Sequence, residues 1–473
     1  MANRGKEFVK DVGIYAIGNI GSKLITFFMV PLYTHYVSDI SDFGYYDICL
    51  SAILLLLPIV TLQLRDGVFR FLVDAKDDVE RKQAVLLAVY KTLATTLAVS
   101  VGIVLFVSIF WEVKYIWLSW GLMCLMALYE VISQAARGIG DAKVFVASGI
   151  ISSFGVGVFS ILCVVVLDGG VPGIFVANIL ARLVAVVYIE IKLGIFGKYL
   201  VPAVKTCGVS SSLLREVLKY STPLIFVSMY WWLTNCSDRF FIAHYLGLRS
   251  NGIYSVAVRF TSILQTFGLI FYQAWQDSAF HQYNSPDRNR FFSSVFNGYI
   301  FVLAVILLVY TFGLKIIYPW LVDSGYRESI AYLYPLGVSA LLYTMVQFTN
   351  IIYQCALDTY STLPQMVAIS TINIVLNFVL IRWLGVYGVI ATSIISYLVL
   401  LLYRSFDMRR YVKLKIAPAV AVPIVVAVLG GIPFYLNTSA ALDIAFVVVS
   451  AVVMYIALPR QFKDKLLSRI RRC

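Results

Sequence analysis

Residues 84–109 have the sequence AVLLAVYKTLATTLAVSVGIVLFVSI, in which Lys91 is the only charged side chain. Crossing the hydrocarbon core of a bilayer takes about 20 apolar residues in a helix, and this run is long enough. Lipid offers no hydrogen-bond partner to an open backbone, so such a segment has to be helical. This stretch therefore predicts a membrane-spanning helix.

The rest of the chain has the same character. It is 60% hydrophobic and 13% charged, whereas a soluble protein carries about 25% charged residues. We therefore predict an all-α polytopic membrane protein with about fourteen transmembrane helices. The expected spans lie near residues 12–35, 45–64, 84–109, 115–136, 144–167, 172–193, 221–245, 253–276, 293–316, 331–355, 362–381, 386–406, 416–436 and 441–458.

The distribution of basic residues orients these spans. With fourteen helices, 28 of the 38 Lys and Arg residues fall in one set of loops and termini, among them Arg215, Lys219 and Arg404. Five fall in the opposite set, among them Lys315. Because basic residues accumulate in cytoplasmic loops, both termini are expected on the cytoplasmic side. The net charge of +13 suits the anionic inner leaflet, so it indicates no nucleic-acid partner.

Two parts of the chain repeat the same features. The shared pairs are Lys6-Glu7 with Arg215-Glu216, His35-Tyr36 with His244-Tyr245, and Gly44-x-Tyr46 with Gly252-x-Tyr254. An even number of spans separates the copies, which predicts parallel halves related by an axis along the membrane normal. We expect a six-helix lobe over 1–205, a second over 206–411, and two additional helices with a basic cytoplasmic tail over 412–473.

Charges within the spans are costly and mark functional surfaces. Lys23, Arg182 and Arg259 lie too deep for easy snorkelling, so we expect them to line a transport cavity. Five amide side chains are predicted to line the same cavity, although intramembrane amides also serve simply to link helices. They are Asn19, Asn235, Gln273, Gln347 and Asn350.

Other charged residues lie nearer the ends of the spans. Arg65, Arg70 and Arg137 are candidates for a cytoplasmic gate or a headgroup contact, with snorkelling to lipid phosphates as the alternative. A further set, comprising Glu130, Asp238 and Arg239, is open to two interpretations. These residues either carry a coupling ion or form ion pairs between helices.

Several chemistries find no support in the sequence. The seven cysteines form no C-x-x-C pair and the three histidines are far apart, so no metal site is expected. There is no phosphate-binding glycine loop and no catalytic constellation, so neither a cofactor nor an enzymatic activity is expected. A polysaccharide polymerase would need a sizeable outer loop, and the longest one, around 317–330, is short.

Four segments carry a family resemblance. YAIGNIGSKLITFFMVPLYTHYVSDISDFGYYD (15–47) resembles the opening of oligosaccharide flippases. LREVLKYSTPLIFVSMYWWLTNCSDRFFIAHYLG (214–247) with NGIYSVAVRF (251–260) resembles the start of that family's second half. ARGIGDAKVF (136–145) is also similar. The family belongs to the multidrug/oligosaccharidyl-lipid/polysaccharide exporter superfamily, and its two lobes rock around a central cavity.

The resemblance implies a flippase of the bacterial inner membrane. Its cargo would be an undecaprenyl-pyrophosphate-linked oligosaccharide unit, moved to the periplasmic leaflet by alternating access for O-antigen (lipopolysaccharide), capsule or exopolysaccharide synthesis. The implied partners are this lipid, membrane lipids, and the polymerase and chain-length machinery. A multidrug or metabolite exporter of the same superfamily is the alternative, although the deep charges are mostly basic, which favours an anionic cargo.

Overall fold

The computed structural model describes residues 25–457 except 26, 38, 77, 207–210, 359, 437 and 438. These residues form helices joined by short connections, with no β-strand among them. The chain divides into two compact units, unit 1 (Met1–Phe240) and unit 2 (Phe241–Cys473). The all-helical polytopic fold predicted from the sequence is therefore confirmed.

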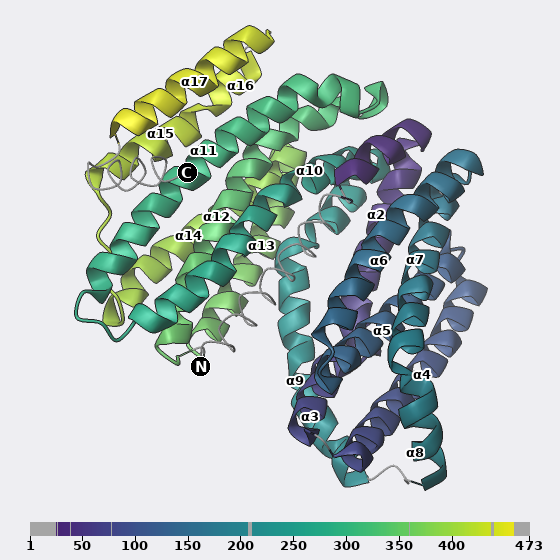
Figure 1. The fold of residues 1–473 in the computed structure, drawn as a ribbon. Helices are drawn as coiled ribbons and strands as arrows, with labels where there is room; N and C mark the ends of the chain where they lie inside the picture. The colour runs from purple at the N-terminus through teal and green to yellow at the C-terminus, as the bar shows by residue number, and fades with distance from the viewer. Residues whose placement is uncertain are drawn as a thin grey trace. The chain divides into compact units, whose positions relative to one another are not determined.

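Unit 1 runs from purple to teal in Figure 1. Residues 27–36 are helical. The π-helical segments Ile161–Val166 and Ile195–Leu200 follow α6 and α7 respectively. In unit 1, α5 and α7 are packed together, with α3 against α5 and α6 against α7. The labelled helices are α2 (Ile40–Val60), α3 (Leu64–Ala75), α4 (Val79–Phe110), α5 (Ile116–Ile139), α6 (Ala142–Ser160), α7 (Gly170–Leu193), α8 (Val201–Thr206) and α9 (Ser211–Asn235).

Unit 2 runs from teal to yellow in Figure 1, with α15 and α17 packed along α11. Unit 2 also contains short 3-10 turns. Ser324–Ser329 precedes α12, Met408–Arg410 follows α14, and Pro418–Val420 precedes α15. Its labelled helices are α10 (Asp238–Gln282), α11 (Arg288–Leu321), α12 (Ile330–Cys355), α13 (Thr362–Leu384), α14 (Val386–Asp407), α15 (Ala421–Leu429), α16 (Gly431–Leu436) and α17 (Ala440–Ala457). The first residues of α10 belong to unit 1.

Twelve segments of the described chain are long and apolar enough to cross a membrane. They correspond to twelve of the fourteen expected spans. The first expected span, 12–35, falls largely outside the described residues. The seventh, 221–245, does not form one helix, because α9 ends at Asn235 and α10 begins at Asp238. The polar residues of α9 also lower its hydropathy.

The tight turn between α5 and α6 follows directly from its sequence, Gly140-Asp141. Gly140 has a φ of 110°, which a residue with a side chain rarely adopts. The Asp141 carboxylate then accepts a hydrogen bond from the Val144 N–H at 3.0 Å, the usual way to cap a helix start. The turn thus reverses the chain within two residues and lets α6 follow α5 directly.

The two sequence copies share a local backbone pattern. In the first copy, Val37 and Asp39 are not helical; they follow the His35-Tyr36 pair and precede α2. In the second copy, Gly247 interrupts α10 with a φ of 87° and a ψ of 166°, shortly after His244-Tyr245. Both copies therefore have a helix, a break and a second helix at matching positions. The lobe boundaries at 205 and 411 derive from the sequence repeat, and they stay a prediction.

Stacked aromatic rings join α10, α11 and α12 in unit 2. The rings of Phe271 and Tyr299 are 3.7 Å apart and nearly parallel. Those of Trp275 and Phe348 lie 4.6 Å apart with an angle of 10° between their planes. Such rings bury large apolar areas and stack with defined geometry, so they fix the spacing of the three helices.

Buried ionic contacts fix two further helix pairs. Arg239, at the start of α10, forms an ion pair with Asp47 of α2 at 2.6 Å, and the Asp47 side chain is 4% exposed. Arg239 therefore takes part in an ion pair with a neighbouring helix, one of the two interpretations left open above. In unit 2, Lys315 of α11 pairs with Asp443 of α17 at 3.0 Å. Lys315 thus lies within a helix and not in the outer loop that the charge count assumed.

Arg404 is the largest fully buried side chain in the described chain. The charge count placed it in a cytoplasmic loop, but it lies in the last turn of α14. Its guanidinium donates to the side-chain oxygens of Gln365 at 2.9 Å and Thr349 at 3.0 Å, and to the Val346 carbonyl at 3.2 Å. Arg404 therefore links α14 to α12 and α13.

We expect Asp47→Asn to lower the free energy of unfolding by about 3–5 kcal/mol, because it leaves the buried Arg239 without its counter-charge. Thermal unfolding of the purified protein in detergent measures the change. The matched control is Asp42→Asn, which breaks the more exposed pair with Lys114 and should cost less than about 1 kcal/mol. Equal melting temperatures for the two variants would contradict the structural role of the Asp47 pair.

Arg404→Lys should destabilise unit 2 even though it preserves the charge, because an ammonium lacks the planar fork that reaches four acceptors, those of Gln365, Val346, Thr349 and Asn350. Arg404→Ala should cost more than about 3 kcal/mol, since several buried acceptors lose their donor. Limited proteolysis and thermal unfolding report both changes. Exposed Arg409 provides the control variant, Arg409→Ala, and a loss of stability as large as that of Arg404→Ala would argue against the network.

Candidate functional site

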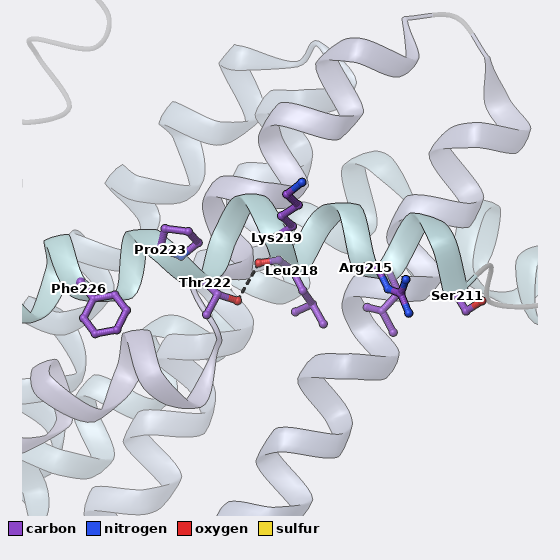
Figure 2. A pocket seen from close by; sticks show the side chains of 8 residues that line it. Ser211, Arg215, Leu218, Lys219, Thr222, Pro223 and Phe226 are labelled. Carbon is purple, nitrogen blue, oxygen red and sulfur yellow. Dashed lines mark hydrogen bonds between the residues drawn. The ribbon is translucent and has the colours of Figure 1, made fainter. Parts of the chain in front are cut away.

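A shallow, open groove with a volume of about 630 Å³ runs along one face of α9 (Figure 2). All of its lining residues come from this one helix of unit 1. They are Ser211, Leu214, Arg215, Leu218, Lys219, Thr222, Pro223 and Phe226. Residues three, four and seven apart share a face of a helix, so the groove follows one face of α9 over several turns.

A different face of α9 holds the helix to the rest of unit 1. Val217 and Ser221 are fully buried. The space beside Ser221 is filled by α3, where a Cβ added at Gly67 would lie 2.3 Å from the Ser221 hydroxyl. Further along, Trp232 donates from its indole nitrogen to the Ser51 carbonyl of α2 at 2.7 Å. The groove is therefore on a helix whose rotation is fixed by packing.

The groove changes character along its length. Its first half carries two exposed cations, Arg215 and Lys219, one helical turn apart. Its second half is apolar, and Phe226 is 72% exposed. Between them, the Thr222 hydroxyl donates to the Leu218 carbonyl at 2.7 Å. Pro223 lacks the N–H that would bond the Lys219 carbonyl, so the helix is locally weakened where the two halves meet.

A second group of polar residues in unit 1 includes three of the predicted site residues. Arg65 of α3 pairs with Glu130 of α5 at 3.4 Å and with Asp66 at 3.5 Å. Arg182 of α7 donates to the backbone and side-chain oxygens of Asn178, at 2.9 and 3.0 Å. Glu130 lies within electrostatic range of both arginines. The structure thus brings Arg65 and Glu130 into direct contact, whereas Arg182 bonds to Asn178 of its own helix.

The other predicted residues of unit 1 lie apart from this group. Arg70 pairs with Asp74 on its own helix at 3.3 Å. Arg137 is exposed, and its guanidinium lies over the Phe69 ring at 4.4 Å. At the other end of α9, Asn235 donates to the Trp231 carbonyl at 2.9 Å, and Asp238 is buried at the start of α10.

In unit 2, two predicted residues belong to the Arg404 network. Gln347 accepts a hydrogen bond from Asn350 at 2.9 Å, and Asn350 accepts one from Arg404 at 2.6 Å. Arg259 and Gln273 are half-buried on α10. The remaining predictions, Asn19 and Lys23, lie outside the described residues.

The same network continues to the surface beyond α14. Asp407 accepts from the Tyr353 hydroxyl at 2.7 Å and from Arg410 at 3.0 Å. Hydrogen bonds from Ser361 and Tyr411, together with the charge of Arg410, lower the pKa of Asp358 in the connection between α12 and α13. These contacts extend the Arg404 network to the connection between α12 and α13.

Sequence reasoning did not select Arg215, Lys219 or Arg404 as site residues. It counted all three among the cytoplasmic loop cations. The spacing of Arg215 and Lys219, four residues apart beside an apolar run, was a signal that could have identified the groove. Among the described residues, no group of three His, Cys, Asp or Glu side chains could hold a metal ion.

Comparisons with solved structures reveal likenesses of fold. The lipid II flippase MurJ, in an inward closed conformation, matches with a TM-score of 0.74 and 13% identity, covering 96% of this chain and 99% of that one. An inward-facing multidrug resistance MATE family transporter of the MOP superfamily matches with a TM-score of 0.59 and 14% identity, covering 82% and 98%. A MOP superfamily transporter from Pyrococcus furiosus matches with a TM-score of 0.54 and 14% identity, covering 85% and 96%.

The likeness to the flippase covers 96% of the chain, so it includes most of the segment from α15 to α17. No curated protein matches the sequence. Residues 8–275, more than half of the chain, match the model of the family described as polysaccharide biosynthesis protein. With a helical membrane fold like that of MOP superfamily transporters, the chain belongs to the polysaccharide biosynthesis protein family.

Proposed function

We propose that this protein is a flippase for a polyprenyl-diphosphate-linked oligosaccharide. It moves an undecaprenyl-linked repeat unit from the cytoplasmic to the periplasmic leaflet of the bacterial inner membrane, for O-antigen, capsule or exopolysaccharide synthesis. The observation that carries the proposal is the family match over residues 8–275 on a chain with a transporter-like membrane fold. Both termini lie in the cytoplasm in this proposal.

The charges within the helices suit this cargo. A diphosphate needs cationic partners in a water-accessible place, and Arg binds it with forked hydrogen bonds whereas Lys acts as a point charge. Arg182 and Arg259 lie within helices α7 and α10, and Lys23 precedes the helical residues 27–36. In the proposal, these cations and the amides Asn19, Asn235, Gln273, Gln347 and Asn350 line the passage used by the headgroup.

The direction of transport is electrically favourable. Moving negative charge outward across an inside-negative membrane is downhill by about 2.3 kcal/mol per charge per 100 mV. Transport by alternating access then needs a step that returns the empty carrier. Glu130, which lies beside Arg65 and within range of Arg182, is the carboxylate we propose for coupling that step to an ion.

The protein acts as a carrier and not as a catalyst in this proposal. Flipping makes and breaks no covalent bond, so it requires neither a nucleophile nor a metal. The sugar chain is extended elsewhere, by a polymerase and chain-length machinery that would receive the flipped lipid. The same lipid substrate is then the link between the two activities.

A drug or metabolite exporter is the second candidate. The observation in its favour is the fold likeness to multidrug resistance MATE family transporters. Against it, the deep charges are mostly basic, which disfavours cationic drugs. Drug accumulation and surface polysaccharide in a deletion strain distinguish the two. Loss of an exporter increases drug accumulation and leaves the polysaccharide normal. Loss of a flippase leaves drug accumulation unchanged and reduces the polysaccharide.

Lys23→Ala and Arg259→Ala should each reduce surface polysaccharide by more than about tenfold, because each removes a charge-assisted contact to the diphosphate. Complementation of a deletion strain, with polysaccharide measured by electrophoresis and protein level by immunoblot, provides the test. Lys91→Ala, at an exposed position of α4, is the control and should leave the polysaccharide unchanged. Normal polysaccharide in a strain carrying both changes would remove these two cations from the mechanism.

A further inference from the structure

The groove on α9 has the two-part character of a lipid-binding site. Its cationic half begins near the start of the helix, and its apolar half ends at Phe226 (Figure 2). We propose that it is a loading site for the substrate lipid, in which Arg215 and Lys219 hold the diphosphate and the polyprenyl chain lies along Leu218, Pro223 and Phe226. This inference rests on the flippase function proposed above.

The charges of the groove call for an anionic occupant. Arg215 and Lys219 are both exposed, and no described residue forms an ion pair with either side chain. Two like charges one turn apart on a helix repel each other. A diphosphate placed between them removes this repulsion and supplies acceptors to both, with the Arg fork binding one phosphate in a bidentate manner.

The order of the two halves matches the orientation of a lipid. In the expected topology the start of α9 faces the cytoplasm, where positive charges concentrate. From Arg215 to Phe226 the helix rises about 16 Å, which takes the groove from the headgroup level into the hydrocarbon. A lipid of the cytoplasmic leaflet has its phosphate and its chain in this same order, so it can enter without turning over.

The attachment of α9 favours a site that is ready before the lipid arrives. Packing at Val217 and Ser221, and the bond from Trp232 to Ser51, leave the groove face directed away from α2 and α3. Phe226 is 72% exposed, a large apolar surface that a prenyl chain covers well. Binding therefore requires no rotation of the helix, and the ordering cost is low.

Binding of synthetic polyprenyl diphosphate to the full-length protein in nanodiscs tests the proposal, with native mass spectrometry as the readout. Arg215→Gln/Lys219→Gln should weaken binding at least about tenfold, since two charge-assisted contacts are lost. Phe226→Ser should weaken it less, by shortening the apolar half. The matched control is Lys192→Gln, at an exposed cation in the last turn of α7, which should bind like the wild type.

Two further probes identify the occupant. Polyprenol, which lacks the diphosphate, should bind equally weakly to the wild type and the double variant. Phosphatidylglycerol, which lacks the prenyl chain, should not compete with polyprenyl diphosphate. Competition at equal concentration would show a general anionic-lipid surface and would overturn the assignment of the groove to the substrate.

Flipping of a fluorescent polyprenyl-diphosphate sugar in proteoliposomes separates this inference from the function itself. If the wild type flips the lipid and the double variant binds and flips it equally well, the loading site is wrong and the flippase function stands. If the wild type neither binds nor flips it, the proposed function fails and the inference fails with it. Slower flipping by the double variant that recovers at high substrate concentration supports loading.

Discussion

The attachment of α9 to α2 and α3 is the constraint on which the presentation of the groove depends. The helix is held at its first half by the close contact of Ser221 with Gly67 and at its second half by the bond from Trp232 to Ser51. The Asp47–Arg239 pair then fixes the chain just beyond it. Because these contacts occupy one side, the cations of the groove are presented on the other.

Buried charge explains why the helices have fixed partners. A charged side chain in a low-dielectric interior must be paired or saturated with hydrogen bonds, and the structure meets this requirement in two ways. Arg239 and Lys315 each have a carboxylate from another helix. Arg404 instead binds neutral oxygens from α12 and α13. Each solution requires particular helices at particular depths, so the charges specify packing that apolar contacts alone would leave less defined.

Much of the fold could be predicted because the length and the apolar character of a spanning helix are local properties of the sequence. The helix cap at Asp141 and the turn at Gly140 likewise depend only on residues that are neighbours in the sequence. The site was less predictable, because the role of a charge depends on what another helix places beside it. Arg404 and Arg409 are similar in sequence position, yet one is buried and the other exposed. Contacts such as Arg65 with Glu130 join residues distant in the chain and leave no periodic pattern.

The contact between α11 and α17 has a consequence for biogenesis. Lys315 enters the membrane with α11, whereas its ion-pair partner Asp443 is synthesised 128 residues later. Until the ribosome has completed the final hairpin, the ammonium of α11 lacks this carboxylate and is costly to hold in lipid. Unit 2 therefore reaches its mature state only after translation of α17, and a chain truncated before Asp443 would lack the carboxylate that pairs with Lys315.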